Sequence, residues 1–151
     1  FGQGRGDQLT PLRAMEKFHV VIIYPNISIP TNWVYSCLNL KLTKNEKNIS
    51  ILRKFLSLSD ISQLGVFLEN NLEPIVFQRY PEILELKEEL RGSGARGVLM
   101  SGSGSAVFGI FTDSVVAEKA QEALQKNDNR TVFLTHTVEQ FSEFLPEMLI
   151  I

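Results

Sequence analysis

Apolar residues in this chain fall into short continuous runs, typical of buried strands, and longer stretches with helical spacing. Phe18–Tyr24, Gly97–Met100 and Ala106–Phe111 are short runs rich in β-branched and aromatic residues, and each predicts a strand. Thr131–His136 alternates between polar and apolar residues and predicts a fourth strand. The two middle runs are separated by a stretch of small residues, so we expect them to form a hairpin.

Helical spacing appears between the first strand and the hairpin. Thr31 is placed to cap a short helix over Asn32–Leu38. Ile51–Phe55 and Asp60–Tyr80 also have helical periodicity, but a proline in the second stretch predicts a break near Leu72–Pro74. The apolar stripe of that stretch consists of Leu64, Leu68, Leu72, Ile75 and Val76.

Two further helices flank the hairpin. Pro81 opens the first, because the missing N–H of proline costs least at that position. Its predicted core face comprises Ile83, Leu84, Leu86, the Lys87 stem and Leu90. Asp113 or Ser114 caps the second helix, which runs to Lys126. Its small inner face is predicted to comprise Val116, Ala120, Ala123 and Leu124.

The predicted order is strand, helices, strand hairpin, helix and strand. Helices gathered on one face of a mainly antiparallel sheet give an α+β, two-layer sandwich of ferredoxin-like kind. Residues 1–17, which are rich in glycine, predict a connection between domains, and residues 18–151 predict one domain. Because the sequence begins at Phe1 without an initiator methionine, we expect it to be part of a longer polypeptide.

Composition excludes several classes of partner. The 151 residues, of which 44% are hydrophobic, are enough for one domain with a core. A net charge of −2 with interspersed signs predicts neither nucleic-acid nor membrane binding. Cys37 is the only cysteine, which favours a reducing, cytoplasmic compartment. We find no metal-ligand spacing, and no apolar stretch approaches the ~20 residues that cross a bilayer.

The candidate chemistry lies in the hairpin loop Ser101-Gly102-Ser103-Gly104-Ser105. Its glycines permit positive φ, so backbone N–H groups can turn inward beside three hydroxyls and hold an anion. No lysine follows and the chain continues into a strand, which excludes a P-loop, and the glycine spacing excludes a dinucleotide fingerprint. Composition alone favours the alternative, a flexible hairpin turn rich in small residues.

Several strings connect this loop to a known superfamily. Met100–Phe111 resembles the third signature motif of the GHMP kinases, the superfamily of galactokinase, homoserine kinase, mevalonate kinase and phosphomevalonate kinase. Gly4–Leu12, Pro25–Thr31, Asn70–Pro74 and Tyr80–Ile83 are similar, in the same order, to strings of one branch of these kinases. Each string is short, and their order and spacing together carry the resemblance.

The resemblance implies an activity and a partner domain. That branch uses ATP and magnesium to phosphorylate the 2-hydroxyl of a cytidine-diphosphate-linked methylerythritol in non-mevalonate isoprenoid biosynthesis. By resemblance, the loop Ser101–Ser105 comes close to the ATP phosphates and the acceptor. The first glycine-rich ATP loop, the catalytic aspartate and its assisting lysine belong to the family's N-terminal domain. We therefore expect this chain to hold no catalytic residue or metal ligand, and to be inactive alone.

Two residues of the predicted short helix are candidates for substrate binding. Thr31 and Tyr35 lie four residues apart, on one helical face. The resemblance implies that Tyr35 packs on the cytosine and that Thr31 is a neighbouring polar position. The residues alone leave open whether Tyr35 is an ordinary half-buried tyrosine or stacks on a base.

Two alternatives remain open. A ferredoxin-like domain can be a non-catalytic regulatory or dimerisation module, but such a module does not need the loop together with Thr31 and Tyr35. Another GHMP kinase, for mevalonate or homoserine, is disfavoured by the connection Gly4–Asp7. Without its partner domain the chain should fold, and its uncovered apolar surface should favour self-association.

Overall fold

The structure is a computed structural model that describes residues 2–3, 8–9, 17–38, 65 and 68–137. The predicted helix over Ile51–Phe55, the first part of Asp60–Tyr80 and most of the predicted connection over residues 1–17 lie outside the described residues. Within that connection, β1 (Gly2–Gln3) and β2 (Gln8–Leu9) form a short antiparallel pair. In the described part, no helix combines the length and the apolar composition needed to cross a membrane.

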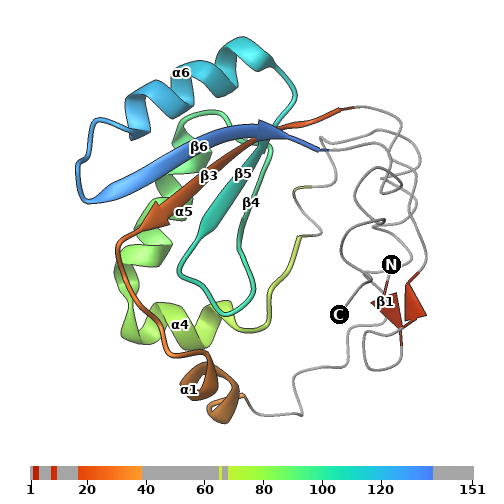
Figure 1. The fold of residues 1–151 in the computed structure, drawn as a ribbon, viewed down its shortest axis with the longest axis vertical. Coiled ribbons are helices and arrows are strands. Elements are labelled where there is room, and N and C mark those ends of the chain that lie inside the picture. Colours follow the sequence, from red (N-terminus) through yellow and green to blue (C-terminus); the bar gives the residue numbers. More distant parts are fainter. Residues whose placement is uncertain (1, 4–7, 10–16, 39–64, 66–67, 138–151) are drawn as a thin grey trace, which may run out of the picture.

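Four antiparallel strands form the central sheet, in the order β4-β5-β3-β6 (Figure 1). β3 (His19–Pro25) lies between β5 (Val107–Phe111) and β6 (Arg130–His136), and β4 (Gly97–Met100) forms the other edge. The four strand predictions are therefore confirmed, to within one residue at each end. The hairpin of β4 and β5 is also confirmed.

α5 (Pro81–Gly92) and α6 (Ser114–Leu124) cover one face of this sheet (Figure 1). The register places Val21 beside Gly109 and Ile23 beside Val107, and all four are buried on the helix side. A Cβ at Gly109 would lie only 3.1 Å from Leu90 Cδ2, so the glycine allows α5 to approach β5 closely. The predicted α+β, two-layer, ferredoxin-like class is confirmed.

The opposite face of the sheet is also apolar. Ile22 pairs with Phe108 on one side and with Phe133 on the other, so the three side chains share this face. Phe133 is 52% exposed, and Tyr24, on the same face, is 48% exposed. Exposed apolar side chains therefore lie on this face of the sheet, and the expected self-association stays a prediction.

Proline and aspartate begin the helices where the sequence predicts. α4 (Glu73–Arg79) starts one residue before Pro74, so the expected break is a helix start. Pro81 is the first residue of α5. Asp113 caps α6, and its Oδ1 accepts a hydrogen bond from the Val116 amide at 3.0 Å. The three signals are confirmed, although α6 ends at Leu124 rather than Lys126.

Three predicted core positions are wrong. In α5 the buried stripe is Ile83, Leu86, Lys87 and Leu90. Leu84 lies off this stripe and is 41% exposed. In α6 the buried stripe is Ala117, Ala120 and Leu124. Val116 and Ala123 are exposed, because each lies one position before a residue of that stripe.

Candidate functional site

The Gly/Ser loop, Ser101–Ser105, connects β4 to β5. Gly102 and Gly104 have φ of 54° and 85°, which is left-handed backbone that favours glycine. The loop turns back on itself, because the Gly104 amide donates to the Ser101 carbonyl at 2.9 Å. Among the described residues, no acceptor receives a hydrogen bond from the amides of Gly102 or Ser103. The loop therefore has two amide donors that no described residue uses, and its role as an anion site stays a prediction.

The two sides of the loop differ. A Cβ at Gly104 would lie 2.9 Å from Met100 Sδ and 3.2 Å from Ile29 Cδ1, so this glycine packs against the core. A Cβ at Gly102 would meet no atom within 4 Å, so Gly102 is on the open side. Ser105 is buried, and its hydroxyl donates to the Pro25 carbonyl at 3.4 Å. The open side thus consists of the first three residues of the loop.

Thr31 lies directly beside the loop. It is the first residue of α1 (Thr31–Ser36), and its Oγ1 is 3.0 Å from Ser103 Oγ. The predicted role of Thr31 as an N-cap is wrong. Pro30 occupies the cap position and has no side-chain acceptor for a capping hydrogen bond, while the Thr31 hydroxyl pairs with the loop. A residue distant in sequence therefore meets the open side of the loop.

Tyr35 projects from α1, one turn after Thr31. Its side chain is 57% exposed. Among the described residues, none makes a hydrogen bond or a ring contact with this side chain, although the backbone carbonyl of Tyr35 accepts from the Leu38 amide at 3.2 Å. The ring is therefore accessible to a ligand, and its stacking on a base stays a prediction.

An aromatic cluster that sequence reasoning missed anchors α1. Trp33 and Tyr80 meet edge to face, with ring centroids 5.9 Å apart, and Arg79 Cζ lies 4.7 Å from the centre of the Trp33 ring. Val34 is fully buried beside them. The cluster leaves Thr31 and Tyr35 on the accessible part of the helix. Tyr80 belongs to the family-like string Tyr80–Ile83, but no sequence pattern indicates that its ring contacts Trp33.

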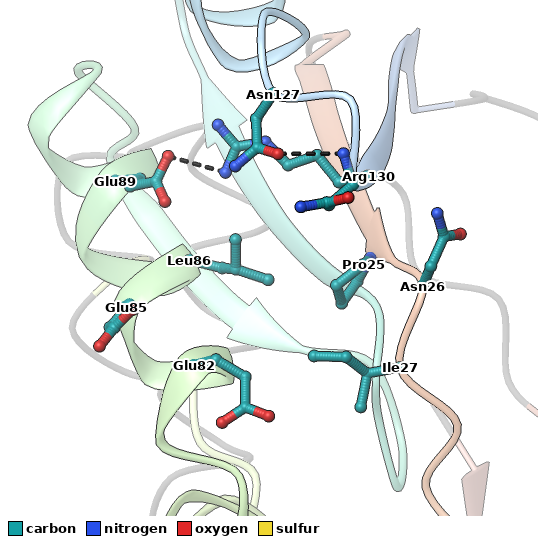
Figure 2. Close-up of a pocket in the computed structure, with 10 residues that line it drawn as sticks. Pro25, Asn26, Ile27, Glu82, Glu85, Leu86, Glu89, Asn127 and Arg130 are labelled. Atoms are coloured by element: carbon teal, nitrogen blue, oxygen red, sulfur yellow. Dashed lines mark hydrogen bonds and ion pairs between the residues drawn. The ribbon is translucent and has the colours of Figure 1, made fainter.

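A separate hollow of about 350 Å³ lies between α5 and the segments that follow β3 and precede β6 (Figure 2). We call it the acidic hollow, because Glu82, Glu85 and Glu89 of α5 line it. The other lining residues are Pro25, Asn26, Ile27, Leu86, Asn127, Asn129 and Arg130.

The charges of the acidic hollow disfavour a phosphate ligand. Its one lining cation, Arg130, forms an ion pair with Glu89 at 2.8 Å (Figure 2). Arg130 Nε also donates to the Leu124 carbonyl at 2.7 Å. Glu82 and Glu85 then leave the lining with excess negative charge, which repels phosphate. The Gly/Ser loop is therefore the better candidate for an anion site. Within the described residues, no cluster of three or more His, Cys, Asp or Glu side chains could hold a metal ion.

Comparison with known families identifies the domain. Residues 47–130 match the model of the family described as GHMP kinases C terminal, and this range includes both the Gly/Ser loop and most residues that line the acidic hollow. The chain belongs to the GHMP kinase C-terminal family. The resemblance drawn from the Met100–Phe111 string is thereby confirmed.

Curated relatives of this GHMP kinase domain are more specific. The chain is 43% identical over 124 residues to the 4-diphosphocytidyl-2-C-methyl-D-erythritol kinase of Geobacter sp. (strain M21), covering 82% of this chain and 42% of that protein. It is 38% identical over 135 residues to the kinase of the same name from Syntrophotalea carbinolica, covering 89% of this chain and 46% of that protein. The chain thus spans less than half the length of these relatives.

Solved structures show the same fold. A crystal structure of 4-(cytidine 5'-diphospho)-2C-methyl-D-erythritol kinase superposes with a TM-score of 0.73 and 29% identity, over 88% of this chain and 47% of that chain. Mevalonate kinase of L. major superposes with a TM-score of 0.70 at 15% identity, over 87% of this chain and 45% of that chain. The second likeness concerns the fold alone.

Proposed function

We propose that this GHMP kinase domain is the C-terminal, substrate-binding part of an ATP-dependent kinase. Its substrate would be 4-diphosphocytidyl-2-C-methyl-D-erythritol, phosphorylated at the 2-hydroxyl in non-mevalonate isoprenoid biosynthesis in the cytoplasm. The relatives that bear this kinase's name support the proposal. The single observation that carries it is the open side of the Gly/Ser loop, which lies directly beside Thr31.

The loop would hold phosphate oxygens. The donors would be the amides of Gly102 and Ser103 and the hydroxyls of Ser101 and Ser103. Space for the phosphate is open at Gly102, where an added Cβ would meet no atom within 4 Å. Fixed donors aimed at developing negative charge are the main means by which proteins accelerate phosphoryl transfer. Ser105 would act differently, by holding the end of the loop through its bond to the Pro25 carbonyl.

The exposed face of α1 would bind the nucleoside end of the substrate. An accessible aromatic ring stacks well on a base, and Tyr35 is one helical turn from Thr31. Because Thr31 contacts Ser103, this arrangement would place the cytosine and the phosphates at neighbouring positions. The loop and α1 would thereby bind two parts of one ligand.

The described residues fit the phosphates of ATP, because the open side of the loop presents donors. When bound, ATP would supply the phosphoryl group, and magnesium would neutralise part of the phosphate charge. The phosphate oxygens themselves, and residues of the N-terminal domain, would hold the magnesium. The catalytic groups would belong to an N-terminal domain, which would be the main protein partner of this chain.

A phosphoryl-transfer assay tests the proposal. The full-length enzyme that contains this chain, given ATP, magnesium and the cytidylyl substrate, is expected to phosphorylate that substrate. The isolated chain is expected to fold, to bind either ligand weakly or not at all, and to show no turnover, since half of each site is absent. Phosphorylation of mevalonate or homoserine instead would contradict the proposed substrate. Enzyme-like turnover by the 151-residue chain alone would contradict the assignment of the catalytic groups to another domain.

A further inference from the structure

The segment that precedes α4 is bonded to the Gly/Ser loop. Asn70 Nδ2 donates to two carbonyls, that of Met100 at 2.9 Å and that of Gly102 at 2.7 Å. Asn70 Oδ1 accepts from the Leu72 amide at 3.0 Å, just before α4 begins. The Asn70 side chain therefore connects two segments. Its NH2 group binds the Gly/Ser loop and the strand end before it, and its oxygen binds the backbone at the start of α4.

The first residue of α4 holds the same strand end. Glu73 Oε1 accepts from the Met100 amide at 2.8 Å, and Glu73 Oε2 accepts from Lys87 Nζ at 2.6 Å. The side chains of Glu73 and Lys87 are only 13% and 6% exposed. This buried pair connects α4 to α5, so the residue before the loop is bonded to the rigid helical layer. Asn70 therefore acts on a loop whose base is already fixed.

The bond to the Gly102 carbonyl determines which way the next amide points. In a trans peptide the C=O and the following N–H point in opposite directions. The Gly102–Ser103 peptide is trans, because the only cis bond among the described residues is at Gly104–Ser105. Since Asn70 binds the Gly102 carbonyl, the Ser103 N–H must point away from Asn70. The Ser103 amide, like that of Gly102, has no acceptor among the described residues.

We propose that Asn70 is a positioning residue, which orients the Ser103 N–H toward the phosphate in the kinase reaction. This inference rests on the proposed function of the loop. Asn70 does not touch the ligand, and its effect passes through the Gly102–Ser103 peptide. Because residue 102 is a glycine, its backbone has more conformational freedom than that of other residues. Without the bond from Asn70, the Gly102–Ser103 peptide could therefore rotate and turn the Ser103 N–H away from the phosphate.

The variant Asn70→Asp separates this role from a merely structural one. Aspartate keeps the shape and the acceptor for the Leu72 amide, but it loses both donors and brings a carboxylate to two carbonyls. Asn71→Asp is the matched control, because it makes the same chemical change at the neighbouring exposed residue. Asn70→Ala is a second variant without the added charge, for use if Asn70→Asp does not fold.

Two readouts are needed. In the isolated chain, backbone amide NMR reports the Ser103 N–H directly, and we expect its resonance to shift in the Asn70 variant while amides of α6 stay in place. In the full-length enzyme, kcat is expected to fall at least about tenfold, which corresponds to about 1.4 kcal/mol. The KM for the cytidylyl substrate should change less than kcat, because Tyr35 is untouched. Asn71→Asp is expected to alter neither readout.

The outcomes are distinct. An unchanged Ser103 resonance overturns the proposal, and so does a shifted resonance with unchanged kcat. A shifted resonance together with reduced kcat, neither of them seen in Asn71→Asp, supports it. If the full-length wild type does not phosphorylate the cytidylyl substrate, the proposed function fails, and the NMR comparison alone then decides whether Asn70 orients the loop.

Discussion

The Gly/Ser loop and the acidic hollow adjoin the same segment of chain, but only the loop suits a phosphate ligand. Pro25 lines the hollow, and its carbonyl accepts the Ser105 hydroxyl of the loop. The hollow has a volume of about 350 Å³, but its one lining cation is already paired with Glu89. The loop has donors with an open approach at Gly102. For a phosphate ligand, the sign of the charge and the direction of the donors are a better guide than the size of a cavity.

The two regions also differ in how they are held. The hollow is formed by side chains of α5 and by the turns around β3 and β6. The loop depends on single hydrogen bonds from Thr31, Asn70 and Ser105, and on two glycines with left-handed backbone. Small substitutions in the loop should therefore affect phosphate binding far more than small substitutions in the hollow. The four predictions below test this difference.

Gly104→Val is expected to have the largest effect. We expect a loss of about 2–5 kcal/mol in the free energy of unfolding, from a left-handed backbone cost of roughly 1–2 and an overpacking cost of about 1–3. The added side chain would meet Met100 and Ile29 rather than fill the concavity, so both the fold and the activity should suffer. Urea unfolding measures this. Gly92→Val is the control, because a Cβ there meets no atom within 4 Å. Equal midpoints for the two variants would contradict the packing of Gly104.

Tyr35→Ala should weaken binding of the cytidylyl substrate by ~1–3 kcal/mol, the range for an aromatic ring stacked on a base. Binding of ATP and the free energy of unfolding should change little, because the side chain is 57% exposed. Substrate KM and calorimetric titration of the full-length enzyme measure the effect, with Tyr35→Phe as the control that keeps the ring. A wild-type substrate KM in Tyr35→Ala would remove Tyr35 from the site.

Gly102→Ala should cost about 1 kcal/mol in stability, because φ is 54° but the methyl group meets no atom within 4 Å. The methyl group lies where the phosphate is proposed to approach, so the loss in kcat/KM should exceed the loss expected from stability alone. Gly92→Ala, with the same change in open space, is the control. If both variants keep wild-type kcat/KM, the open side of the loop is not the phosphate site.

Glu85→Gln should have the smallest effect. It removes a charge from the acidic hollow without a change of shape, and no phosphate is expected to bind there. The KM for ATP and the KM for the cytidylyl substrate should both stay at their wild-type values in the full-length enzyme. A clear change in either would mean that the hollow takes part in ligand binding.

The fold could be predicted largely from local signals. Short β-rich runs bounded by turns predict the four strands, and Pro81 and Asp113 predict two helix starts. The errors at Leu84, Val116 and Ala123 come from periodicity, which gives the existence of a stripe more reliably than its exact phase.

The candidate site was only partly predictable. The loop is contiguous, so its glycines and hydroxyls are visible in the sequence. Thr31 contacts Ser103 across 72 positions, and Asn70 contacts Gly102 across 32. No local pattern encodes such pairs. For the same reason Thr31 resembles a helix cap in sequence, whereas in the structure its hydroxyl faces the loop.

The most direct test is a crystal structure of the full-length enzyme with a non-hydrolysable ATP analogue, magnesium and the cytidylyl substrate. The central claim predicts phosphate oxygens within hydrogen-bond distance of the Gly102 or Ser103 amide, the Asn70 side chain still bonded to the Gly102 carbonyl, and no phosphate in the acidic hollow. Phosphates bound elsewhere, with both loop amides facing solvent, would contradict it.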